Sequence, residues 1–372
     1  MIKIELNDEE CPQAIRDFVR NNPDIEIYDY VKRGLNGEVY FGKRIKMGDD
    51  VVLKFYWAQK DFDESEEAIT LRNIDHSNVL KIWDLKFVPK NFAYFLSPKI
   101  SGGDLQSFID SNHISSKEAL EIVAGILMGL TELHSKHKLV HRDLKPGNIL
   151  FDLETKMPII ADLGAVKKVY DTKESVTASK ATFYYLPPES VMNDEYYFQS
   201  DIYQVGILLF QLLGGKFHLD NPIAWCNSKE KNELEKIKNP QEKIARFDDI
   251  ITEKIKKGKL IDTNTLPSHI DSSIKKVINR ATNFHYEKRY SNTALFLKDI
   301  HNLLRAQPDF KILENGELLI SHTSGKKFKI FTEAKKKILL EKCVDGKTWR
   351  KINKHNGDFA KALEIAKNGQ QK

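Results

Sequence analysis

The first hundred residues change from helical to strand-like spacing of apolar side chains. Apolar residues of the N-terminal segment recur at helical intervals at Ala14, Ile15, Phe18 and Val19. We therefore predict a short helical leader over residues 1–24. From residue 25 to about residue 98, β-rich runs such as 51–56 and 92–96 predict strands. An acidic segment with helical spacing, residues 62–74, interrupts them.

The apolar pattern becomes helical again from residue 116 to about residue 306. A β-rich lobe over residues 25–100, followed by a larger helical lobe over residues 101–306, predicts an α+β fold. Ligands often bind in the cleft between two such lobes, so we expect a site there.

The last 66 residues, 307–372, have a third pattern. Turn-forming pairs separate short β-rich runs at Asn315-Gly316, Ser324-Gly325 and Asp345-Gly346. Asp358 then precedes a segment with helical spacing, where it can cap the first turn. These features predict a small α+β accessory module.

Composition and charge support this division. A chain of 372 residues with 41% hydrophobic and 10% aromatic residues can bury a large core, which excludes wholesale disorder. The net charge is only +5, yet residues 308–372 hold fifteen lysines and arginines against eight aspartates and glutamates, or +7. The basic character therefore belongs to the accessory module.

Cysteine usage and hydropathy indicate a cytoplasmic protein without a membrane partner. The three cysteines, Cys11, Cys226 and Cys343, are odd in number and far apart, which argues against a disulfide framework and a zinc site. The N-terminus has neither the basic start nor the apolar run of a signal peptide. The longest apolar stretch, residues 202–213, is too short to span a bilayer.

Residues 141–164 combine groups suited to phosphoryl transfer. Asp143 can orient an attacking hydroxyl and accept its proton, and Lys145 can neutralise charge on the moving phosphoryl group. Asn148 can supply an oxygen to Mg²⁺. Asp162 follows an apolar strand at residues 158–161, so it can provide a second Mg²⁺ ligand.

Residues 141–150 and 162–164 resemble the catalytic loop and the Asp-Phe-Gly motif of eukaryotic-type serine/threonine protein kinases. Further motifs extend this resemblance over about residues 25–305. It implies the bilobal protein-kinase fold, protein substrates and the cofactors ATP and Mg²⁺. The accessory module resembles no family that we recognise.

The resemblance also assigns an ATP-binding set in the first lobe. Lys54 would contact the phosphates and pair with Glu67, or with Glu66 if the register shifts by one residue. Lys32 replaces the first glycine of the phosphate-covering loop. Ser97 would be a small gatekeeper residue beside the adenine. The full set of expected ATP contacts is Val31, Gly34, Gly37, Val39, Val52, Lys54, Glu67, Pro98 and Ile100.

Other matched positions imply structural and regulatory roles. Glu189, at the end of the substrate-docking segment, would pair with Arg289, and Asp201 would brace the catalytic loop. Arg142 would bind a phosphate on the activation segment. We expect autophosphorylation at one or more hydroxyl residues of that segment: Thr172, Ser175, Thr177 and Ser179.

Several alternatives remain open. A small-molecule kinase of the aminoglycoside type would share Asp143 and Asn148 but would lack the segment ending in Glu189. A pseudokinase scaffold would signal through the module of residues 307–372 without catalysis, although the catalytic residues are intact. That module could bind nucleic acid, dock a substrate or partner, or inhibit the catalytic lobes, and its lysines could also form only a solvated surface.

Overall fold

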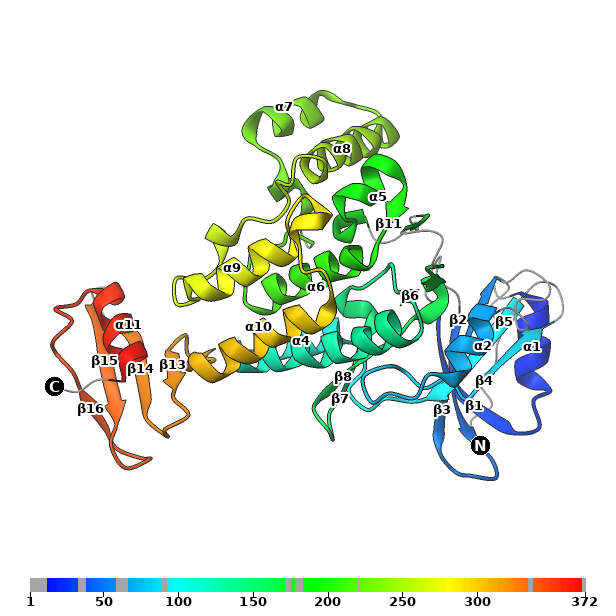
Figure 1. The fold of residues 1–372 in the computed structure, drawn as a ribbon, viewed down its shortest axis with the longest axis horizontal. Helices are drawn as coiled ribbons and strands as arrows, with labels where there is room; N and C mark the ends of the chain where they lie inside the picture. The colour runs from blue at the N-terminus through cyan, green and yellow to red at the C-terminus, as the bar shows by residue number, and fades with distance from the viewer. Residues whose placement is uncertain are drawn as a thin grey trace.

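The computed structural model describes residues 12–32, 38–57, 66–88, 92–170, 175–177, 183–219, 221–333 and 337–369. These residues form three parts that follow one another along the long axis of the molecule (Figure 1). A β-rich lobe lies at one end, a helical lobe lies in the middle, and a small sheet with one helix lies at the other end. The predicted α+β fold with two lobes is confirmed.

The N-terminal lobe is built on a five-stranded antiparallel sheet with the strand order β1-β2-β3-β5-β4. Its strands are β1 (Ile25–Lys32), β2 (Glu38–Arg44), β3 (Asp50–Trp57), β4 (Asp84–Val88) and β5 (Phe92–Pro98). Helix α2 (Glu66–Asn73) lies in the connection between β3 and β4. Residues 93–97 of β5 are all buried, as expected for an apolar strand between two neighbours.

Strand β3 shows how the sheet divides its two faces. Val51, Leu53 and Phe55 are buried in a cluster with helix α1 (Gln13–Arg20). Val52 and Lys54 point to the opposite face and line the cavity between the lobes. This alternation follows from the two-residue period of a strand. Helix α1 therefore covers the face of the sheet that points away from the cavity.

Helix α1 contributes to the core of the N-terminal lobe. Its residues Ile15 and Val19 are buried, and the ring centroid of Phe18 lies 4.9 Å from that of Tyr94. The predicted N-terminal helix is present over these residues. Because its apolar side packs on β3 and β5, we expect its loss to expose a large aromatic surface.

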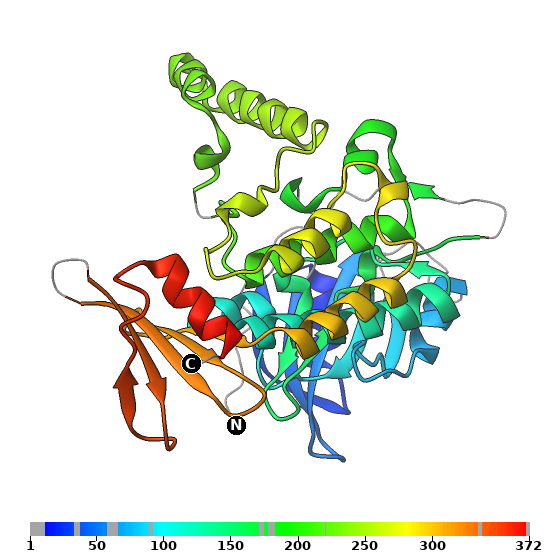
Figure 2. The same ribbon diagram turned by 60° about the vertical axis from the view of Figure 1, so that its left-hand side comes forward.

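The middle lobe is mainly helical. Its helices are α3 (Leu105–Ser111), α4 (Ser116–Thr131), α5 (Pro188–Asn193), α6 (Phe198–Leu212), α7 (Ser228–Lys236), α8 (Pro240–Ile255), α9 (Ser272–Ala281) and α10 (Thr293–Ala306). Helix α6 is buried along almost its whole length and packs among α4, α9 and α10. Helices α7 and α8 project from the lobe (Figure 2). No helix in the described ranges is both long enough and apolar enough to cross a membrane.

Short strand pairs in the middle lobe hold the segments that carry the predicted chemistry. They are β6 (Leu139–Val140) with β9 (Lys167–Lys168), β7 (Ile149–Asp152) with β8 (Met157–Ile160), and β10 (Val176–Thr177) with β11 (Glu195–Tyr196). Only β8 is expected from the sequence pattern. The segment between β6 and β7 contains Asp143, and Asp162 lies two residues after the end of β8.

The C-terminal module is a second five-stranded antiparallel sheet, with its strands in sequence order. The elements are β12 (Asp309–Ile312), β13 (Leu318–Ser321), β14 (Lys327–Glu333), β15 (Lys337–Cys343), β16 (Trp349–Lys351) and α11 (Phe359–Asn368). All three predicted turn pairs lie between strands, and Gly316, Gly325 and Gly346 have φ values of 81°, 82° and 82°. The Asp358 side chain accepts a hydrogen bond from the Lys361 amide, as predicted for the cap of α11.

The module attaches to the middle lobe through its first strand. The Phe310 amide donates to Ser116 Oγ and the Lys117 amide donates to Asp309 Oδ1, both at 2.9 Å. The Phe310 side chain is buried beside His269. The module lies at the opposite end of the molecule from the N-terminal lobe (Figure 1), and its far edge is β16.

Candidate active site

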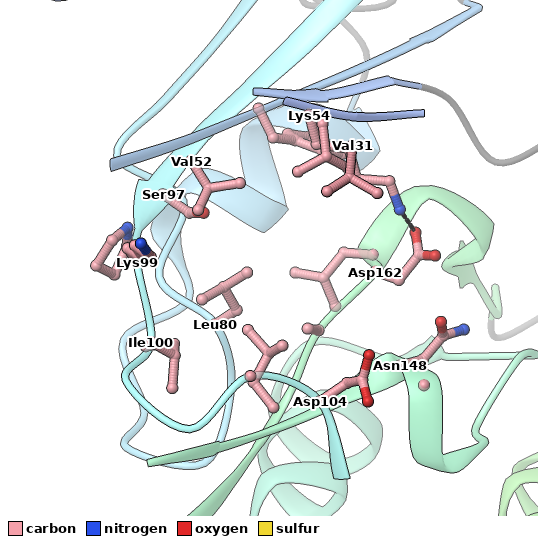
Figure 3. Close-up of a pocket in the computed structure, with 18 of the residues that line it drawn as sticks. Val31, Val52, Lys54, Leu80, Ser97, Lys99, Ile100, Asp104, Asn148 and Asp162 are labelled. Atoms are coloured by element: carbon pink, nitrogen blue, oxygen red, sulfur yellow. Dashed lines mark hydrogen bonds and ion pairs between the residues drawn. The ribbon is translucent and has the colours of Figure 1, made fainter. Parts of the chain in front are cut away.

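A cavity of about 550 Å³ lies between the two lobes. Its walls come from β1, β2, β3 and β5 above and from β7 and the segment after β8 below. The residues labelled in Figure 3 surround it from both lobes. This size and the predominantly apolar lining suit one small organic ligand with a flat ring system.

The apolar part of the cavity contains most of the predicted ATP contacts. Val31, Val39 and Val52 line its upper wall, and Pro98 and Ile100 lie at its back edge. Ser97, the predicted gatekeeper residue, also lines the cavity and is buried. Leu150, Ala161 and Leu163 form the lower wall. The two walls therefore form a slot that can hold a planar ring by contact on both of its faces.

Some predicted residues lie outside the described part of the chain. They are Gly34, Gly37, Thr172 and Ser179. Glu66 and Glu67 belong to α2, but their side chains are not among those described. The expected pairing of Lys54 with Glu67 therefore stays a prediction.

Lys54 and Asp162 meet at the polar end of the cavity. The Lys54 ammonium forms an ion pair with Asp162 Oδ1 (Figure 3). Asp162 has a left-handed backbone conformation, with φ of 55°, two residues after the end of β8. That conformation turns its carboxylate into the cavity, where a cationic side chain from the other lobe can reach it.

Asp143, Lys145 and Asn148 form one hydrogen-bonded group in the loop between β6 and β7. Lys145 Nζ donates to Asp143 Oδ2 at 2.9 Å, and Asn148 Nδ2 donates to the same oxygen at 2.8 Å. Asn148 Nδ2 also donates to the Asp143 carbonyl at 2.8 Å. These contacts fix the carboxylate at the lower rim of the cavity, since Lys145 and Asn148 both line it.

The catalytic loop is held from below by Asp201 of α6. Its carboxylate accepts from the amides of His141 (2.8 Å) and Arg142 (3.0 Å) and from His134 Nε2 (2.7 Å). Burial alone would raise the pKa of Asp201, but the His134 hydrogen bond and the neighbouring imidazoles hold that pKa below its usual value. The ionised acceptor can thus stabilise the left-handed conformation of Arg142, whose φ is 71°.

Arg142 connects this loop to the predicted activation segment. Arg142 Nε donates to the Ala165 carbonyl at 2.6 Å, and Nη1 donates to the Thr177 carbonyl at 2.7 Å. Lys167 Nζ donates to the Thr177 hydroxyl at 3.2 Å. Thr177 is exposed, while Ser175 is half-buried. Of these two described candidates for phosphorylation, Thr177 is the one in contact with both cationic side chains.

Glu189 and Arg289 form a buried, two-pronged ion pair. Arg289 Nη1 and Nη2 each donate to one Glu189 oxygen at 2.8 Å. Ser200 also donates to Glu189, and the guanidinium lies over the Tyr203 ring at 4.7 Å. Both charges are thus satisfied inside the lobe, so the pair joins the first turn of α5 to the segment before α10.

The cavity also contains residues that sequence reasoning did not single out. Asp104 lines the cavity and accepts from the amide and the hydroxyl of Ser107, both at 2.9 Å. Further lining residues are Phe41, Leu80, Ile82 and Phe95. Asp104 carries a recognisable signal, since an aspartate after Gly102-Gly103 and before an apolar run is typical of a helix cap. The apolar residues carry no comparable signal, because any buried strand contains such side chains.

Comparison with known proteins identifies the family. The family model described as "Protein kinase domain" matches residues 26–301, which is most of the chain. The chain belongs to the protein kinase family. The resemblance seen in the motifs is therefore confirmed, and membership in this family implies the use of ATP and a divalent metal ion.

Several relatives are named as serine/threonine-protein kinases. CLA4 of Candida albicans is 26% identical over 63% of this chain and 25% of its own length. The probable kinase PknB of Lactococcus lactis subsp. lactis is 31% identical over 52% of this chain and 32% of its own length. TOUSLED of Arabidopsis thaliana is 29% identical over 59% of this chain and 30% of its own length. The chain thus spans between about a quarter and a third of the length of these relatives.

Proposed function

We propose that this protein is a Mg²⁺- and ATP-dependent serine/threonine protein kinase. The observation that carries the proposal is the joint placement of two groups at one cavity. The Asp143, Lys145 and Asn148 group forms its lower rim, and the Lys54–Asp162 pair forms its polar end. Phosphoryl transfer depends on positioning and electrostatic stabilisation, which these groups can provide together.

The residues of the cavity fit Mg·ATP. The apolar slot suits adenine, and the Lys54 ammonium is placed for phosphate oxygens. Asp162 and Asn148 would hold Mg²⁺, because carboxylate and amide oxygens are the ligands that this ion prefers. Bound Mg²⁺ would neutralise charge on the phosphates. The described residues contain no cluster of three or more His, Cys, Asp or Glu that could hold a metal by itself, which agrees with an ion that is shared with the nucleotide.

Asp143 would orient the substrate hydroxyl and accept its proton. As the hydroxyl oxygen forms its bond to the γ-phosphorus, the bond between that phosphorus and the β–γ bridging oxygen breaks, and ADP leaves. Lys145 lies 2.9 Å from Asp143, where its charge can offset the charge of the moving phosphoryl group. Asn148 keeps the carboxylate oriented through its amide nitrogen.

Two features favour a protein substrate over a small molecule. The first is Lys145, two residues after the proposed base, which follows the serine/threonine kinase pattern. The second is the buried Glu189–Arg289 pair, which anchors the predicted substrate-docking segment. The competing proposal is a pseudokinase scaffold, which requires that the intact group around Asp143 does not catalyse phosphoryl transfer.

The decisive experiment is the intact mass of the full chain before and after incubation with Mg·ATP, beside an Asp143→Ala control. We expect phosphate-sized increments in the native chain and none in the control. If the native chain gains no mass and also fails to phosphorylate generic protein substrates, the pseudokinase alternative is favoured.

We further propose that Thr177 is the main autophosphorylation site. Its contacts with Arg142 and Lys167 support this choice, because a phosphate on the Thr177 hydroxyl would have two cations within reach. Peptide mapping after the Mg·ATP incubation tests the site. Phosphate found only at Thr172, Ser175 or Ser179 would contradict it.

We propose that the module of residues 307–372 binds an anionic partner, with nucleic acid as the first choice. Lys342 of β15 lies directly opposite Arg350 of β16, so two basic residues meet at this edge of the sheet. Exposed lysines surround this hairpin at Lys347, Lys351 and Lys354. This concentration of basic residues at the far edge of the sheet suits an anionic partner.

The binding test uses the full chain and labelled duplex DNA or single-stranded RNA over a range of salt concentrations. Binding that weakens steeply with salt and is lost in a Lys347→Glu/Lys351→Glu variant would support nucleic acid. Salt-independent binding, or no binding, would leave a protein docking partner as the alternative. Inhibition by occupation of the cavity has no structural support here, since no described residue of the module lines the cavity.

We also propose a cytoplasmic location. Cys226 and Cys343 are both free thiols, which suits a reducing compartment. Fractionation of cells that produce the protein would test this location.

A further inference from the structure

The described activation segment is tied to the middle lobe by a small sheet. Strand β10 pairs with β11, with Val176 opposite Tyr196 and Thr177 opposite Glu195. Strand β11 lies between α5 and α6, so it is anchored at both ends by helices of the lobe. The backbone around Thr177 thus has a fixed partner in addition to Arg142.

Tyr196 is the buried residue of this pair. Its side chain is fully buried in a cluster with Val140 and Val169, and Val176 packs against the same cluster. Val140 is the last residue of β6, directly before the catalytic loop, and Val169 directly follows β9. Tyr196 therefore shares one apolar cluster with the strand before the catalytic loop and with two places in the activation segment.

The Tyr196 hydroxyl reaches the two side chains that hold the backbone of the catalytic loop. It lies 2.8 Å from Asp201 Oδ1 and 2.9 Å from Gln204 Oε1. Asp201 accepts from the amides of His141 and Arg142, as described above. Gln204 Oε1 accepts from the amide of Leu144, the residue after the proposed base, at 2.8 Å. One hydroxyl thus bridges the acceptors of three amides that flank Asp143.

The environment keeps this hydroxyl a donor. Burial and the carboxylate of Asp201 raise the pKa of Tyr196 well above its ordinary value. The hydroxyl carries one proton, which it shares between Asp201 Oδ1 and Gln204 Oε1 or donates to one of them at a time, because neither oxygen has a proton to give in return. The Tyr196 hydroxyl is therefore the donor of this contact, and the two oxygens are its acceptors.

We propose that Tyr196 is a positioning residue that couples the pairing of β10 with β11 to the geometry of the catalytic loop. This inference rests on the proposed kinase function. When β10 is paired, Val176 backs the Tyr196 ring, and the hydroxyl holds Asp201 and Gln204 in register with the loop. Contacts at Thr177 that stabilise β10 then also stabilise the position of Asp143 through Tyr196. This effect adds to the direct contact of Arg142 with Thr177.

The chain offers a matched control next to this residue. The hydroxyl of Tyr197 donates to Glu195 Oε2 at 2.8 Å, and its ring stacks on Tyr286. No contact of the Tyr197 side chain with the catalytic loop occurs among the described residues. Tyr197→Phe therefore removes a similar hydrogen bond from the same strand end without touching the proposed bridge.

The experiment compares Tyr196→Phe with Tyr197→Phe in the full chain, each with and without Thr177→Ala. We expect Tyr196→Phe to lower kcat about tenfold, the effect of one lost buried hydrogen bond to a charged group. The KM for ATP should stay unchanged, because Tyr196 does not line the cavity. Tyr197→Phe should keep kcat within about twofold of the native value, since its hydrogen bond to Glu195 does not involve the acceptors that hold the catalytic loop.

The coupling itself is read from the double variants. If Thr177 acts partly through Tyr196, the loss of kcat caused by Thr177→Ala will be smaller in the Tyr196→Phe background than in the native background. Additive losses would overturn the proposal, and so would equal losses of kcat in Tyr196→Phe and Tyr197→Phe.

Hydrogen exchange separates this inference from the kinase proposal. If the native chain transfers no phosphate, the kinase proposal fails, but amide exchange still tests the coupling without ATP. We expect Tyr196→Phe to speed exchange at residues 141–144 and at residues 176–177 together, and Tyr197→Phe to leave residues 141–144 unchanged. Unchanged exchange at residues 141–144 in Tyr196→Phe would overturn the coupling.

Discussion

Two five-stranded antiparallel sheets lie at opposite ends of this molecule (Figure 1). In the N-terminal lobe, α1 covers one face of the sheet, and the other face forms the roof of the cavity. In the C-terminal module, α11 packs against the sheet, whose first strand attaches to the middle lobe. Similar strand patterns thus serve different purposes, and the difference depends on what each sheet faces.

One pair of lysines makes the comparison direct. Lys54 of β3 and Lys329 of β14 lie within strands, and each pairs with a carboxylate, Asp162 or Glu317. Their side chains are similarly exposed, at 22% and 25%. Lys54 lies at a cavity suited to phosphates, whereas Lys329 lies over the Trp349 ring, 4.6 Å from its centroid. Both sites thus have a half-buried lysine paired with a carboxylate. Only the position of Lys54 at the cavity predicts a catalytic role.

The largest expected difference between the two sheets is the effect of replacing each of these lysines by alanine. Lys54→Ala should lower the phosphorylation rate by about 100- to 1,000-fold, because it removes a preorganised charge from the transferring phosphates. Lys329→Ala should leave the rate within about twofold of the native value, because Lys329 does not line the cavity. Initial rates with a protein substrate at saturating Mg·ATP measure both. A large loss of rate in Lys329→Ala would show that the module takes part in catalysis.

The sequence predicts the catalytic residues far better than the contacts between residues that are distant in the chain. Asp143, Lys145 and Asn148 lie within six residues of one another, so their spacing alone indicates a shared site. Lys54 and Asp162 are 108 residues apart, and no periodicity can bring them together. They meet because β3 and the segment after β8 face one cavity.

The roles of Tyr196 and Asp309 are also invisible in the sequence. A strand of two residues, such as β11, is too short to produce an alternating pattern. The contact between Asp309 and Lys117 joins residues 192 positions apart and depends on how the module meets the middle lobe. By contrast, the turns and the helix cap of the module were predictable, because each depends on residues that are close in sequence.

The next expected effect is a loss of unfolding free energy when a core phenylalanine of either sheet is replaced. Phe55 of β3 and Phe328 of β14 are both fully buried. Replacement of either by alanine should cost about 3–5 kcal/mol of unfolding free energy in its own region. Phe55→Ala should also weaken ATP binding, because Phe55 is next to Lys54 in β3. Phe328→Ala should leave ATP binding unchanged.

Calorimetry of each variant with and without Mg·ATP measures these effects. We expect Mg·ATP to raise the transition temperature of Phe328→Ala by as much as that of the native chain. If Phe328→Ala abolishes ATP binding, the two sheets are not independent, and the module must be considered part of the catalytic unit.

The smallest expected effect is a pH dependence at the junction of the module. Burial, with a smaller contribution from Lys367, lowers the pKa of His269 to about 4. The unfolded chain, in which this histidine titrates near its usual pKa of about 6.5, therefore binds more protons than the folded chain between pH 6.5 and 4. Stability at this junction should fall as the pH decreases through that window, by up to about 3 kcal/mol, and should change little more from His269 below pH 4. Lys367, which lies near His269, forms an ion pair with Asp271. Because hydrogen bonds from Ser273 lower the pKa of Asp271, both partners stay charged over most of this pH range.

Thermal unfolding between pH 7 and 4 tests this dependence against a His269→Gln variant, which stays neutral throughout. We expect His269→Gln to lose a large part of the pH slope, and His301→Gln, an exposed control on α10, to keep it. Hydrogen exchange should assign the acid-induced loosening to β12 and not to β3, since only β12 packs beside His269 through Phe310. If β3 loosens over the same pH window in native protein but not in His269→Gln, the module and the N-terminal lobe unfold as one cooperative unit. The module and the N-terminal lobe would then be separated in space but coupled in their unfolding free energy.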